Sequence, residues 1–600
     1  MDSQIKAASD LLASLEKADK LSQENKNNSH ASMPNSKMNI NVKRLNRILH
    51  QFSSVYGTKA SGSIEEEIMQ DEVRKMEGFM CSERFKHTQR PYTAKDVCAL
   101  RPTDACVYPG HHSSRKLWKL LTKLKKDKSF SFTFGALDPV QVTQMAKYLS
   151  TIYVSGWQCS STASVTNEPG PDLADYPYNT VPNKVDQLRR AQEFHDRKQR
   201  ECRSRMSRSE RQASQKIDFL RPIIADGDTG HGGVTAVMRL TKLMIEAGAG
   251  GIHFEDQRAG TKKCGHMAGK VLVSMREQIR RLVAARLQAD IMGAETIIVS
   301  RTDAQAATLL DSNIDCRDHP FILGATVKGV GSLEAYYEEN SQNLGQRDLT
   351  SEWESRAQLS TFPDLVKKEL EAKDKATSQE QFSAWWVRVQ QKGGSLRVMR
   401  EEAKKMFGIT PFFDWDAPRV AEGYYRIKGG KEYCVARAIA FAPYCDMHWM
   451  ETKKPKLHVA QFFAREVKKA RPYAMLAYNL SPSFNWDASG MSDEDMRMYM
   501  KSLSKEGYVW QFITLAGFHL NSLATTEFAR AYAKDNMYAY VQMIQREERS
   551  KRVETLTHQK WSGAEILDRL MKLASGGRSS TTAMQHGNTE AQFWQKASGK

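Results

Sequence analysis

The residues with the clearest chemical potential lie in the stretch Lys262-Lys263-Cys264-Gly265-His266-Met267. Two lysines precede one cysteine, and neighbouring cations lower the pKa of a thiol, so we expect Cys264 to be partly thiolate near neutral pH. His266 adds a second group that can titrate or donate a hydrogen bond. A basic loop with an incidental cysteine is the plain alternative. A zinc site on Cys264 and His266 would need a second Cys/His pair, and none follows at zinc spacing.

The composition indicates a globular protein larger than one ordinary domain. The chain has 600 residues, and none of its apolar runs approaches the ~20 residues that span a bilayer. Its net charge is +18, but lysines and arginines are dispersed among acids, and no zinc-finger, RRM or basic-zipper pattern occurs. We therefore expect small anionic ligands instead of nucleic acid, and no membrane partner. Nine scattered cysteines without a secretory signal are typical of reduced, intracellular thiols.

From about Glu65 onward, short apolar runs alternate with longer amphipathic segments. The apolar runs are residues 132–137, 151–156, 222–226, 251–256, 296–303, 446–451, 474–479 and 510–516. The segments between them, such as 234–249 and 275–292, have the period and length of helices. Eight buried strands that alternate with helices predict an α/β fold, a (β/α)8 barrel of the TIM type with parallel strands.

The alternation breaks once, between Asp303 and Asp446, where charged helical segments indicate an inserted helical subdomain. The predicted organisation is a polar, disordered extension over 1–64, a first barrel part over 65–323, the insertion over 324–414, a second barrel part with C-terminal helices over 415–575, and a flexible tail over 576–600. Residues 38–63 contain four basic residues, no acid and an apolar helical face. That composition resembles a mitochondrial presequence, or a basic helix that packs on the protein.

Polar residues collect just after the predicted strands, where barrel enzymes keep their active sites. Four acids are hard oxygen donors that suit Mg²⁺ or Mn²⁺, with water completing the coordination: Asp172, Asp226, Asp228 and Glu255. For any single acid, a helix cap or a solvated loop is the alternative. Several acids at adjacent strand ends favour a cation site.

Further polar residues predict two sites for anions. Arg301 can clamp a carboxylate with two hydrogen bonds, pair with one of the acids, or do both. A second candidate carboxylate pocket, whose residue types also occur in turns, consists of Asn479, Ser481, Ser483 and Thr514. The candidate walls of the site, which could equally be core, are Trp157, Trp449 and Phe512. A divalent cation, two anion pockets and a thiol fit the cleavage of a small di- or tricarboxylate.

Several long motifs in this chain resemble those of the isocitrate lyase family. The stretch 262–267 matches the family signature Lys-Lys-Cys-Gly-His-Met, and further matching motifs lie in family order at 153–158, 172–177, 224–230, 476–486 and 511–517. The resemblance covers about Glu65 to the C-terminus, and the insertion is similar to that of eukaryotic, plant-type members. It implies Mg²⁺-dependent, reversible cleavage of isocitrate to glyoxylate and succinate, the first step of the glyoxylate bypass. It also implies a homotetramer whose subunits exchange helices.

The resemblance implies roles for individual residues as well. The glyoxylate half of the substrate would be held by Ser155, Gly156, Trp157 and Arg301. Asp226 would be the principal metal ligand, with Asp172, Asp228 and Glu255 bound directly or through water. The succinate half would be held by Gly265, His266, Asn479, Ser481, Ser483 and Thr514. Cys264 would protonate the departing succinate, with His266, Arg301 and Glu255 completing the catalytic set.

Two other functions compete with this prediction. A 2-methylisocitrate lyase performs the same chemistry on a substrate with one more methyl group, a difference of only about 1–3 kcal/mol in a pocket. Bulky Trp449 and Phe512 beside Thr514 resemble the isocitrate-type pocket, and this resemblance implies a preference for the unmethylated substrate. A catalytically silent homologue would have lost some charged site residues, and here all are present. The resemblance implies a glyoxysome or peroxisome, but the chain ends in Ala-Ser-Gly-Lys, so the mitochondrion and the cytosol stay open.

Overall fold

The computed structural model describes residues 62–165, 168–343, 345 and 347–594. Most of the predicted extension over 1–64, including most of the basic stretch 38–63, lies outside the described residues, as does the end of the tail. The chain forms two compact units. In the first, the described residues form helices α3 (Gly62–Met80) and α4 (Ala94–Ala99). Helix α4 begins at a reciprocal cap between Thr93 and Asp96.

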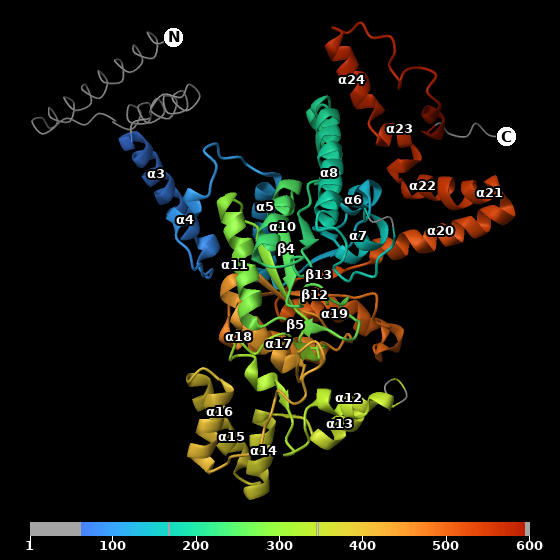
Figure 1. Cartoon of the computed structure of the whole chain (residues 1–600). Helices are drawn as coiled ribbons and strands as arrows, with labels where there is room; N and C mark the ends of the chain where they lie inside the picture. The colour runs from blue at the N-terminus through green and yellow to red at the C-terminus, as the bar shows by residue number, and fades with distance from the viewer. Residues whose placement is uncertain (1–61, 166–167, 344, 346, 595–600) are drawn as a thin grey trace, which may run out of the picture. The chain divides into compact units, whose positions relative to one another are not determined.

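The second unit contains the predicted barrel (Figure 1). Its strands are β1 (Ser131–Phe134), β2 (Ile152–Val154), β3 (Ile223–Asp226), β4 (Gly251–Glu255), β6 (Ile297–Thr302), β11 (Met447–Met450), β12 (Met475–Asn479) and β13 (Tyr508–Ile513). All neighbours pair in parallel, in the order β1-β13-β12-β11-β6-β4-β3-β2. A parallel bridge between Gly135 and Tyr153 joins the two end strands. The predicted eight-stranded parallel barrel is confirmed.

The eighth strand begins and ends slightly earlier than predicted. The run 510–516 was expected, and β13 spans 508–513. Gly507, with φ +92°, completes the turn after helix α19 (Asp493–Lys505), so the strand starts at once with the buried Tyr508. Ala516 already belongs to the next helix, α20 (Ala516–Asp535).

Helices cover the outside of the barrel because each buries one apolar stripe against the strands. These helices include α8 (Thr180–Ser204), α10 (Val234–Ala247), α11 (Met275–Ile291), α17 (Lys431–Phe441) and α18 (Leu457–Ala470). In α10, Leu240 and Met244 are buried, and Gly248 ends the helix in a left-handed conformation at φ +106°. Inside the barrel, Leu117 and Leu121 of α5 (Pro109–Lys126) pack in the same apolar cluster as inward-facing strand residues.

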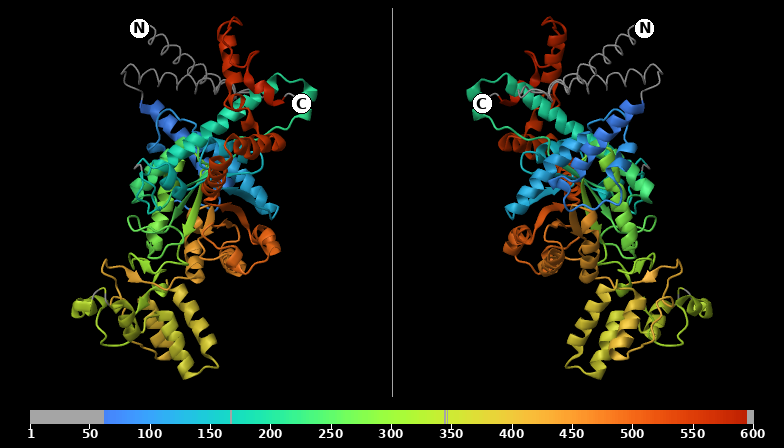
Figure 2. Two further views of the ribbon diagram at one scale, coloured as in Figure 1. Left: turned by 90° about the vertical axis from the view of Figure 1, so that its right-hand side faces the viewer. Right: turned by 90° about the vertical axis from the view of Figure 1, so that its left-hand side faces the viewer.

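Between β6 and β11 the chain forms a largely helical region (Figure 2). Its helices are α12 (Leu333–Glu339), α13 (Leu349–Ala357), α14 (Phe362–Lys373), α15 (Ser378–Gln391) and α16 (Leu396–Phe407). Helices α14, α15 and α16 share an apolar cluster around Trp385, whereas α12 and α13 pack around Trp353. Two backbone hydrogen bonds, of 2.7 and 3.0 Å, join Ala325 to Asp414, so the chain leaves and returns at one place.

The C-terminal helices expose many apolar side chains. These helices are α20, α21 (Met537–Tyr540), α22 (Arg546–Lys551), α23 (His558–Trp561) and α24 (Ala564–Ala574). Leu523 of α20 is 60% exposed, and Leu573 of α24 is 61% exposed. No helix in the described ranges is long and apolar enough to cross a membrane.

Candidate active site

The carboxyl ends of the barrel strands and the loops after them surround a small polar cavity of about 40 Å³. Its lining includes the predicted site residues Ser155, Trp157, Asp172, Asp226, Cys264, Gly265, His266, Arg301, Asn479, Ser481, Ser483 and Thr514. Tyr153, Glu451 and Leu515 complete the lining. Ligand pockets usually measure roughly 300–1,000 Å³, so a substrate of several heavy atoms requires surrounding loops to move.

Asp226, at the end of β3, is held by the segment that follows the neighbouring strand β2. The backbone N–H of Gly156 donates to Asp226 Oδ2 at 2.9 Å. A Cβ atom at Gly156 would lie 2.6 Å from the Tyr176 hydroxyl and 2.8 Å from Asp226 Oδ2, so only glycine fits there. Ser155 caps helix α7 (Gly156–Thr162) by accepting from the Gln158 N–H. Gly156 therefore positions Asp226 from behind the cavity wall.

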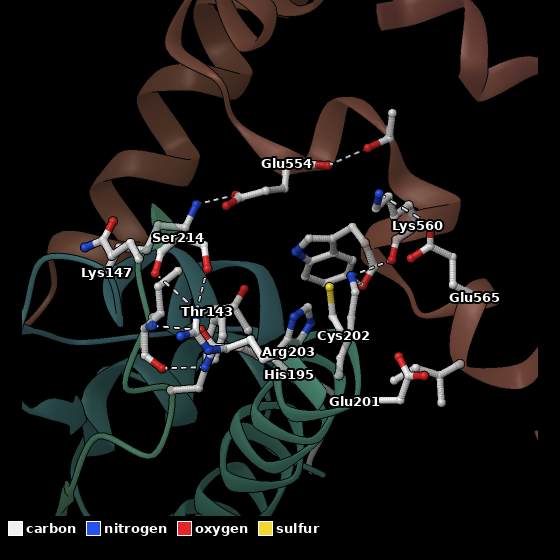
Figure 3. Close-up of a pocket in the computed structure, with 18 of the residues that line it drawn as sticks. Thr143, Lys147, His195, Glu201, Cys202, Arg203, Ser214, Glu554, Lys560 and Glu565 are labelled. Atoms are coloured by element: carbon white, nitrogen blue, oxygen red, sulfur yellow. Dashed lines mark hydrogen bonds and ion pairs between the residues drawn. The ribbon is translucent and has the colours of Figure 1, made fainter. Parts of the chain in front are cut away.

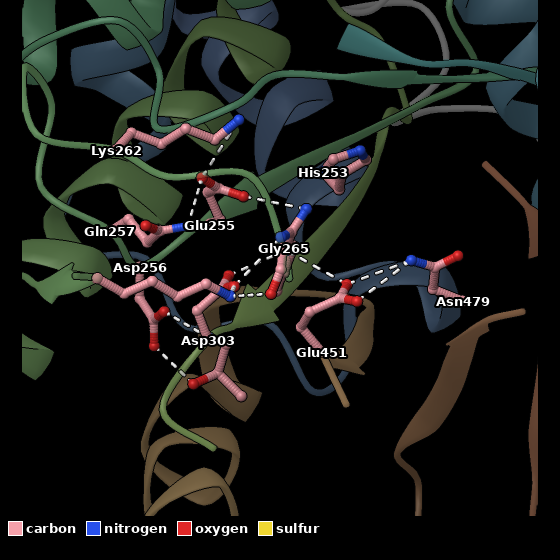
Figure 4. Close-up of polar contacts among 12 residues, drawn as sticks. His253, Glu255, Asp256, Gln257, Lys262, Gly265, Asp303, Glu451 and Asn479 are labelled. Atoms are coloured by element: carbon pink, nitrogen blue, oxygen red, sulfur yellow. Dashed lines mark hydrogen bonds and ion pairs between the residues drawn. The ribbon is translucent and has the colours of Figure 1, made fainter. Parts of the chain in front are cut away.

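Three of the predicted metal ligands surround one buried ammonium group. Lys262 Nζ lies 2.6 Å from Asp172 Oδ1 and 3.3 Å from Asp228 Oδ2. It also lies 4.0 Å from Glu255 Oε1 (Figure 4). Asp172 and Asp226 line the cavity, whereas Asp228 and Glu255 lie behind it. Burial raises the pKa of Asp172 to about 8, with Lys262 opposing this and Asp228 adding to it. One ammonium group thus faces several carboxyl groups, and a bound cation would favour the ionised form of Asp172.

The loops that carry these acids contain strained backbone. Four residues other than glycine have positive φ angles: Asp172 at +61°, Ala174 at +56°, Asp228 at +53° and His231 at +55°. Such conformations cost of order 1 kcal/mol or more and cluster at functional sites. Here they turn the acid side chains toward Lys262 and the cavity.

The donor set fits Mg²⁺. In the described part of the chain, no three His, Cys, Asp or Glu side chains converge closely enough to hold a metal between them. Mg²⁺ needs fewer protein ligands, because it binds through one or two carboxylates and keeps several waters. Asp172 and Asp226 present hard oxygens to the cavity, and a bound cation would offset the repulsion between the neighbouring acids.

Cys264 lies in the cavity wall on the loop after β4, but its thiol is not activated as predicted. Burial raises the pKa of Cys264 to about 11; Asp172 adds to this, and Lys262 and Arg301 oppose it. Lys262 also pairs with the acid cluster, and it lowers the pKa of the thiol by less than burial raises it. The prediction of a partial thiolate was therefore wrong, and Cys264 holds its proton at neutral pH. Beside it, His266 Nε2 lies 3.6 Å from Glu451 Oε1.

Arg301, at the end of β6, is both ion-paired and part of the cavity lining. Its Nη1 lies 3.1 Å from Glu255 Oε2, and its Nε donates to Asp303 Oδ2 at 2.9 Å. The guanidinium lies 4.5 Å above the ring of Trp449. These contacts fix the plane of the guanidinium, and its remaining N–H groups can serve a ligand in the cavity.

The turn after β12 presents amide and hydroxyl groups to the opposite side of the cavity. Asn479 Nδ2 donates to Glu451 Oε1 at 3.2 Å. The Ser483 N–H donates to Ser481 Oγ at 3.1 Å, and the Trp486 indole donates to the Ser481 carbonyl oxygen at 3.1 Å. These bonds fix the turn in the shape that places Ser481 and Ser483 in the lining.

Two of the three predicted walls belong to the barrel interior instead. Trp157 lines the cavity, whereas Trp449 and Phe512 are 1% and 0% exposed and pack together, with ring centroids 5.0 Å apart. Alternate residues of a barrel strand point to opposite faces, so a position near a strand end does not by itself reach the cavity. Trp449 and Phe512 therefore give no basis for selection against an extra methyl group.

The sequence model of the isocitrate lyase family matches residues 72–593. The chain belongs to the isocitrate lyase family. Isocitrate lyase from Oryza sativa subsp. japonica is 53% identical, over 88% of this chain and 94% of that protein. A mitochondrial 2-methylisocitrate lyase from Hypocrea atroviridis is 43% identical, over 89% of this chain and 96% of that protein. A solved structure of oxaloacetate acetylhydrolase with 3,3-difluorooxalacetate covers 79% of this chain, with a TM-score of 0.43 and 14% identity.

Besides Leu515, the sequence reasoning missed two polar lining residues of this isocitrate lyase family member. Glu451 is 2% exposed and contacts Asn479, His266 and Arg301. Tyr153 places its hydroxyl 3.0 Å from His253 Nε2 and 3.3 Å from Asp226 Oδ2. The available signal was position: Glu451 follows β11 directly, as the other site acids follow their strands.

Proposed function

We propose that this protein is an isocitrate lyase, which cleaves isocitrate reversibly to glyoxylate and succinate in the first step of the glyoxylate bypass. The observation that carries this proposal is the convergence of Cys264, Arg301 and Asn479, from three separate segments, on one cavity with the acids. It occurs in a chain that is 53% identical to an isocitrate lyase. A thiol, a cation site and two anion-binding groups suit a tricarboxylate whose carbon–carbon bond breaks.

The two halves of the substrate would bind on opposite sides of the cavity. Arg301, Ser155 and Trp157, with the Gly156 segment, would hold the glyoxylate half beside Asp226. The succinate half would bind to the group formed by Gly265, His266, Asn479, Ser481, Ser483 and Thr514. The lining of a single cavity by residues of both groups supports this division.

The reaction requires one proton to be removed and one to be delivered. A base takes the proton of the C2 hydroxyl, the C2–C3 bond breaks, and C2 becomes the aldehyde carbon of glyoxylate. The electron pair stays on C3 of the departing succinate, and the Cys264 thiol donates its proton there. A thiol that keeps its proton at neutral pH supports this donor role. In the reverse direction the same sulfur would take the proton back.

Mg²⁺, with Mn²⁺ as the alternative, would be held by Asp226 and Asp172, with Asp228 and Glu255 directly or through water. When bound, the cation would polarise substrate oxygens and stabilise negative charge that develops on them. Lys262 keeps the acids together against their mutual repulsion. EDTA should abolish turnover, and added Mg²⁺ should restore it. Full activity after exhaustive chelation would rule out the metal assignment.

The activity is tested with purified protein, Mg²⁺ and isocitrate, with glyoxylate trapped as its hydrazone. Glyoxylate should accumulate in proportion to enzyme, and an equal amount of succinate should form. A wild-type protein that folds but forms no glyoxylate with Mg²⁺ or Mn²⁺ would overturn the proposal and favour a catalytically silent homologue.

A 2-methylisocitrate lyase is the second candidate, because a relative with that activity in its name is 43% identical to this chain. Trp449 and Phe512 do not line the cavity, so an extra methyl group would meet residues of the lining, such as Thr514 or Leu515. Assays of both substrates under the same conditions decide the matter. A higher kcat/KM for 2-methylisocitrate, with release of pyruvate, would reverse the assignment.

We also propose a homotetramer whose subunits exchange C-terminal helices. The exposed apolar side chains that support it are Leu520, Leu523, Tyr538, Leu567, Leu570 and Leu573. Residues of this kind are expected to be covered by another copy. Light scattering after size-exclusion chromatography should give about four times the mass of one chain; a monomer would refute the exchange. For the compartment we propose a glyoxysome or peroxisome, with the mitochondrion or cytosol as alternatives, to be decided by imaging with a free C-terminus.

A further inference from the structure

The loop that carries Cys264, residues 262–267, is fixed by two buried polar contacts. Near its start, Gln257 accepts from the Lys263 N–H at 3.0 Å and donates from Nε2 to the Lys263 carbonyl oxygen at 2.8 Å. At its tip, Lys270 Nζ donates to the carbonyl oxygen of Gly265. Lys270 is 0% exposed although it follows a run of exposed loop residues. The backbone on both sides of Cys264 is therefore tied to the protein interior.

The second bond of Lys270 is to Asp303, the carboxylate that also binds the arginine of the site. Lys270 Nζ lies 2.5 Å from Asp303 Oδ1. The same carboxylate accepts from Arg301 Nε at 2.9 Å and from Arg301 Nη2 at 3.2 Å. One buried carboxylate thus fixes both the tip of the loop and the guanidinium plane that faces the cavity.

Asp303 is itself immobilised by its neighbours. Its backbone N–H donates to Asp256 Oδ1 at 2.9 Å. Asp256 Oδ2 accepts from Thr302 Oγ1 at 2.6 Å and from Arg437 Nη1 at 3.1 Å, and Arg437 is fully buried. Lys270 is therefore anchored to a rigid point of the barrel, because each buried charge here has an opposite partner.

Lys270 does not line the cavity, so it does not touch the substrate. Burial of an ammonium group costs free energy, which here is offset by the carboxylate of Asp303 and the carbonyl oxygen of Gly265. We propose that Lys270 is a positioning residue, which locks the tip of the 262–267 loop to the carboxylate that orients Arg301. Because the cavity is too small for isocitrate, the loop opens to admit it, and the Lys270 bonds make Cys264 and Arg301 return to position together.

This inference rests on the proposed function for its kinetic part but not for its structural part. The test compares wild type with Lys270→Met, which keeps the length of the side chain and removes its charge. Lys242→Met is the matched control. Lys242 forms an exposed ion pair with Glu246 and does not line the cavity. Lys270→Arg retains a cation beside Asp303 and covers the case in which the methionine variant fails to fold. Thermal unfolding verifies the fold of each variant.

The first readout is the rate at which iodoacetamide alkylates Cys264 without substrate, measured by peptide mapping. Exposed Cys202 is the internal reference. In Lys270→Met, alkylation of Cys264 should rise at least about fivefold while Cys202 is unchanged, because the loop is no longer held closed. Lys270→Arg should give an intermediate rate. An unchanged Cys264 rate in folded Lys270→Met, or in Lys270→Arg if methionine prevents folding, would overturn the proposal.

The second readout is turnover of isocitrate. Lys270→Met should lower kcat about 50-fold with KM changed less than about threefold, because displaced catalytic groups cost rate more than binding. Lys270→Arg should recover part of the loss, and Lys242→Met should match wild type. Equal kcat in wild type and Lys270→Met would overturn the proposal. If no protein, wild type included, turns over isocitrate, the proposed function fails, and the alkylation rates alone decide the role of Lys270.

Discussion

Two cavities of this molecule differ in size and in chemistry, and the smaller one holds the more reactive groups. The cavity at the mouth of the barrel measures about 40 Å³ and is lined by carboxylates, a guanidinium, a thiol and hydroxyls. A side cavity of about 430 Å³ lies between helices α6 (Pro139–Met145) and α8, the segment 214–219 and the C-terminal segment 552–566 (Figure 3). Of these two cavities, the side cavity has the volume that is usual for a ligand pocket.

The polar groups of the side cavity serve one another. Lys147 pairs with Glu554, and Lys198 donates to the carbonyl oxygens of Lys560 and Trp561. His195 packs against Trp561 with ring centroids 4.9 Å apart, and burial lowers the pKa of His195 to about 4, so its ring is neutral. At the barrel mouth, groups from several strands point at one small space. Convergence of unlike charges, and not volume, identifies the reactive site.

The largest effect on kcat is expected when the thiols of the two cavities are replaced in turn. Cys264→Ser should reduce kcat by about a thousandfold, because a serine hydroxyl is a far weaker acid toward the carbanion. Cys202→Ser, in the side cavity, should leave kcat within about twofold of wild type, since Cys202 has no place in the proposed chemistry. Glyoxylate formation under saturating isocitrate measures both. Comparable losses in the two variants would break the comparison.

A smaller effect, on kcat/KM, is expected when an arginine of each cavity is replaced by lysine. Arg301→Lys should lower kcat/KM by about a hundredfold, because an ammonium group cannot keep the flat, forked contacts with Glu255 and Asp303 while it binds a carboxylate. Arg203→Lys is the control, since Arg203 in the side cavity bonds to the carbonyl oxygens of Ser214 and Arg211. Its kcat/KM should stay within about twofold of wild type. Steady-state assays at several isocitrate concentrations measure this, and an active Arg301→Lys enzyme would contradict the assignment.

Acid should destabilise the protein through buried neutral histidines. Burial lowers the pKa of His195 and of His448 to about 4. The value in an unfolded chain is about 6.5, so the unfolded state binds more protons below that pH. The contribution of each histidine is complete above about pH 6.5 and is lost as the pH falls toward 4. Each should lower the free energy of unfolding by up to about 2 kcal/mol at pH 5.

Urea unfolding of His195→Phe at about pH 7.5 and about pH 5 measures this loss. The variant should lose less stability on acidification than wild type, because phenylalanine cannot be protonated. His458→Phe is the control, since His458 is exposed on α18. An acid loss in His195→Phe as large as that of wild type would show that the side-cavity histidine is not the titrating group.

The smallest effect concerns the ion pairs that close the side cavity. Glu554→Gln removes the partner of Lys147, but Glu554 is 51% exposed. The free energy of unfolding should therefore fall by less than about 1 kcal/mol, and kcat should not change. Urea midpoints and glyoxylate assays on the same preparation provide the measurement. A large loss of kcat would mean that the side cavity takes part in catalysis after all.

The strands and the site were predictable for the same reason. Runs such as 251–256 are apolar and end in acids because both faces of a barrel strand are buried and the site lies at its carboxyl end. Neither burial depth nor side-chain direction can be obtained from such runs. The pKa of Cys264 was therefore wrongly expected to fall, and the sequence left open whether Trp449 belongs to the wall or to the core. Glu451 was missed because its contacts with His266 and Asn479 join separate segments. The domain limits and residue roles stay predictions.

The backbone pairing of Ala325 with Asp414 has a consequence for how this chain can vary. Because the two ends of the intervening segment meet, that segment is a closed loop whose ends are fixed to the barrel part of the chain. The entropic cost of closing a flexible loop grows only by about 0.6 kcal/mol for each doubling of its length. Insertions at exposed points of the segment should therefore leave the geometry at Cys264 and Arg301 unchanged, as long as its outside contacts, such as Lys428 with Asp364, are kept.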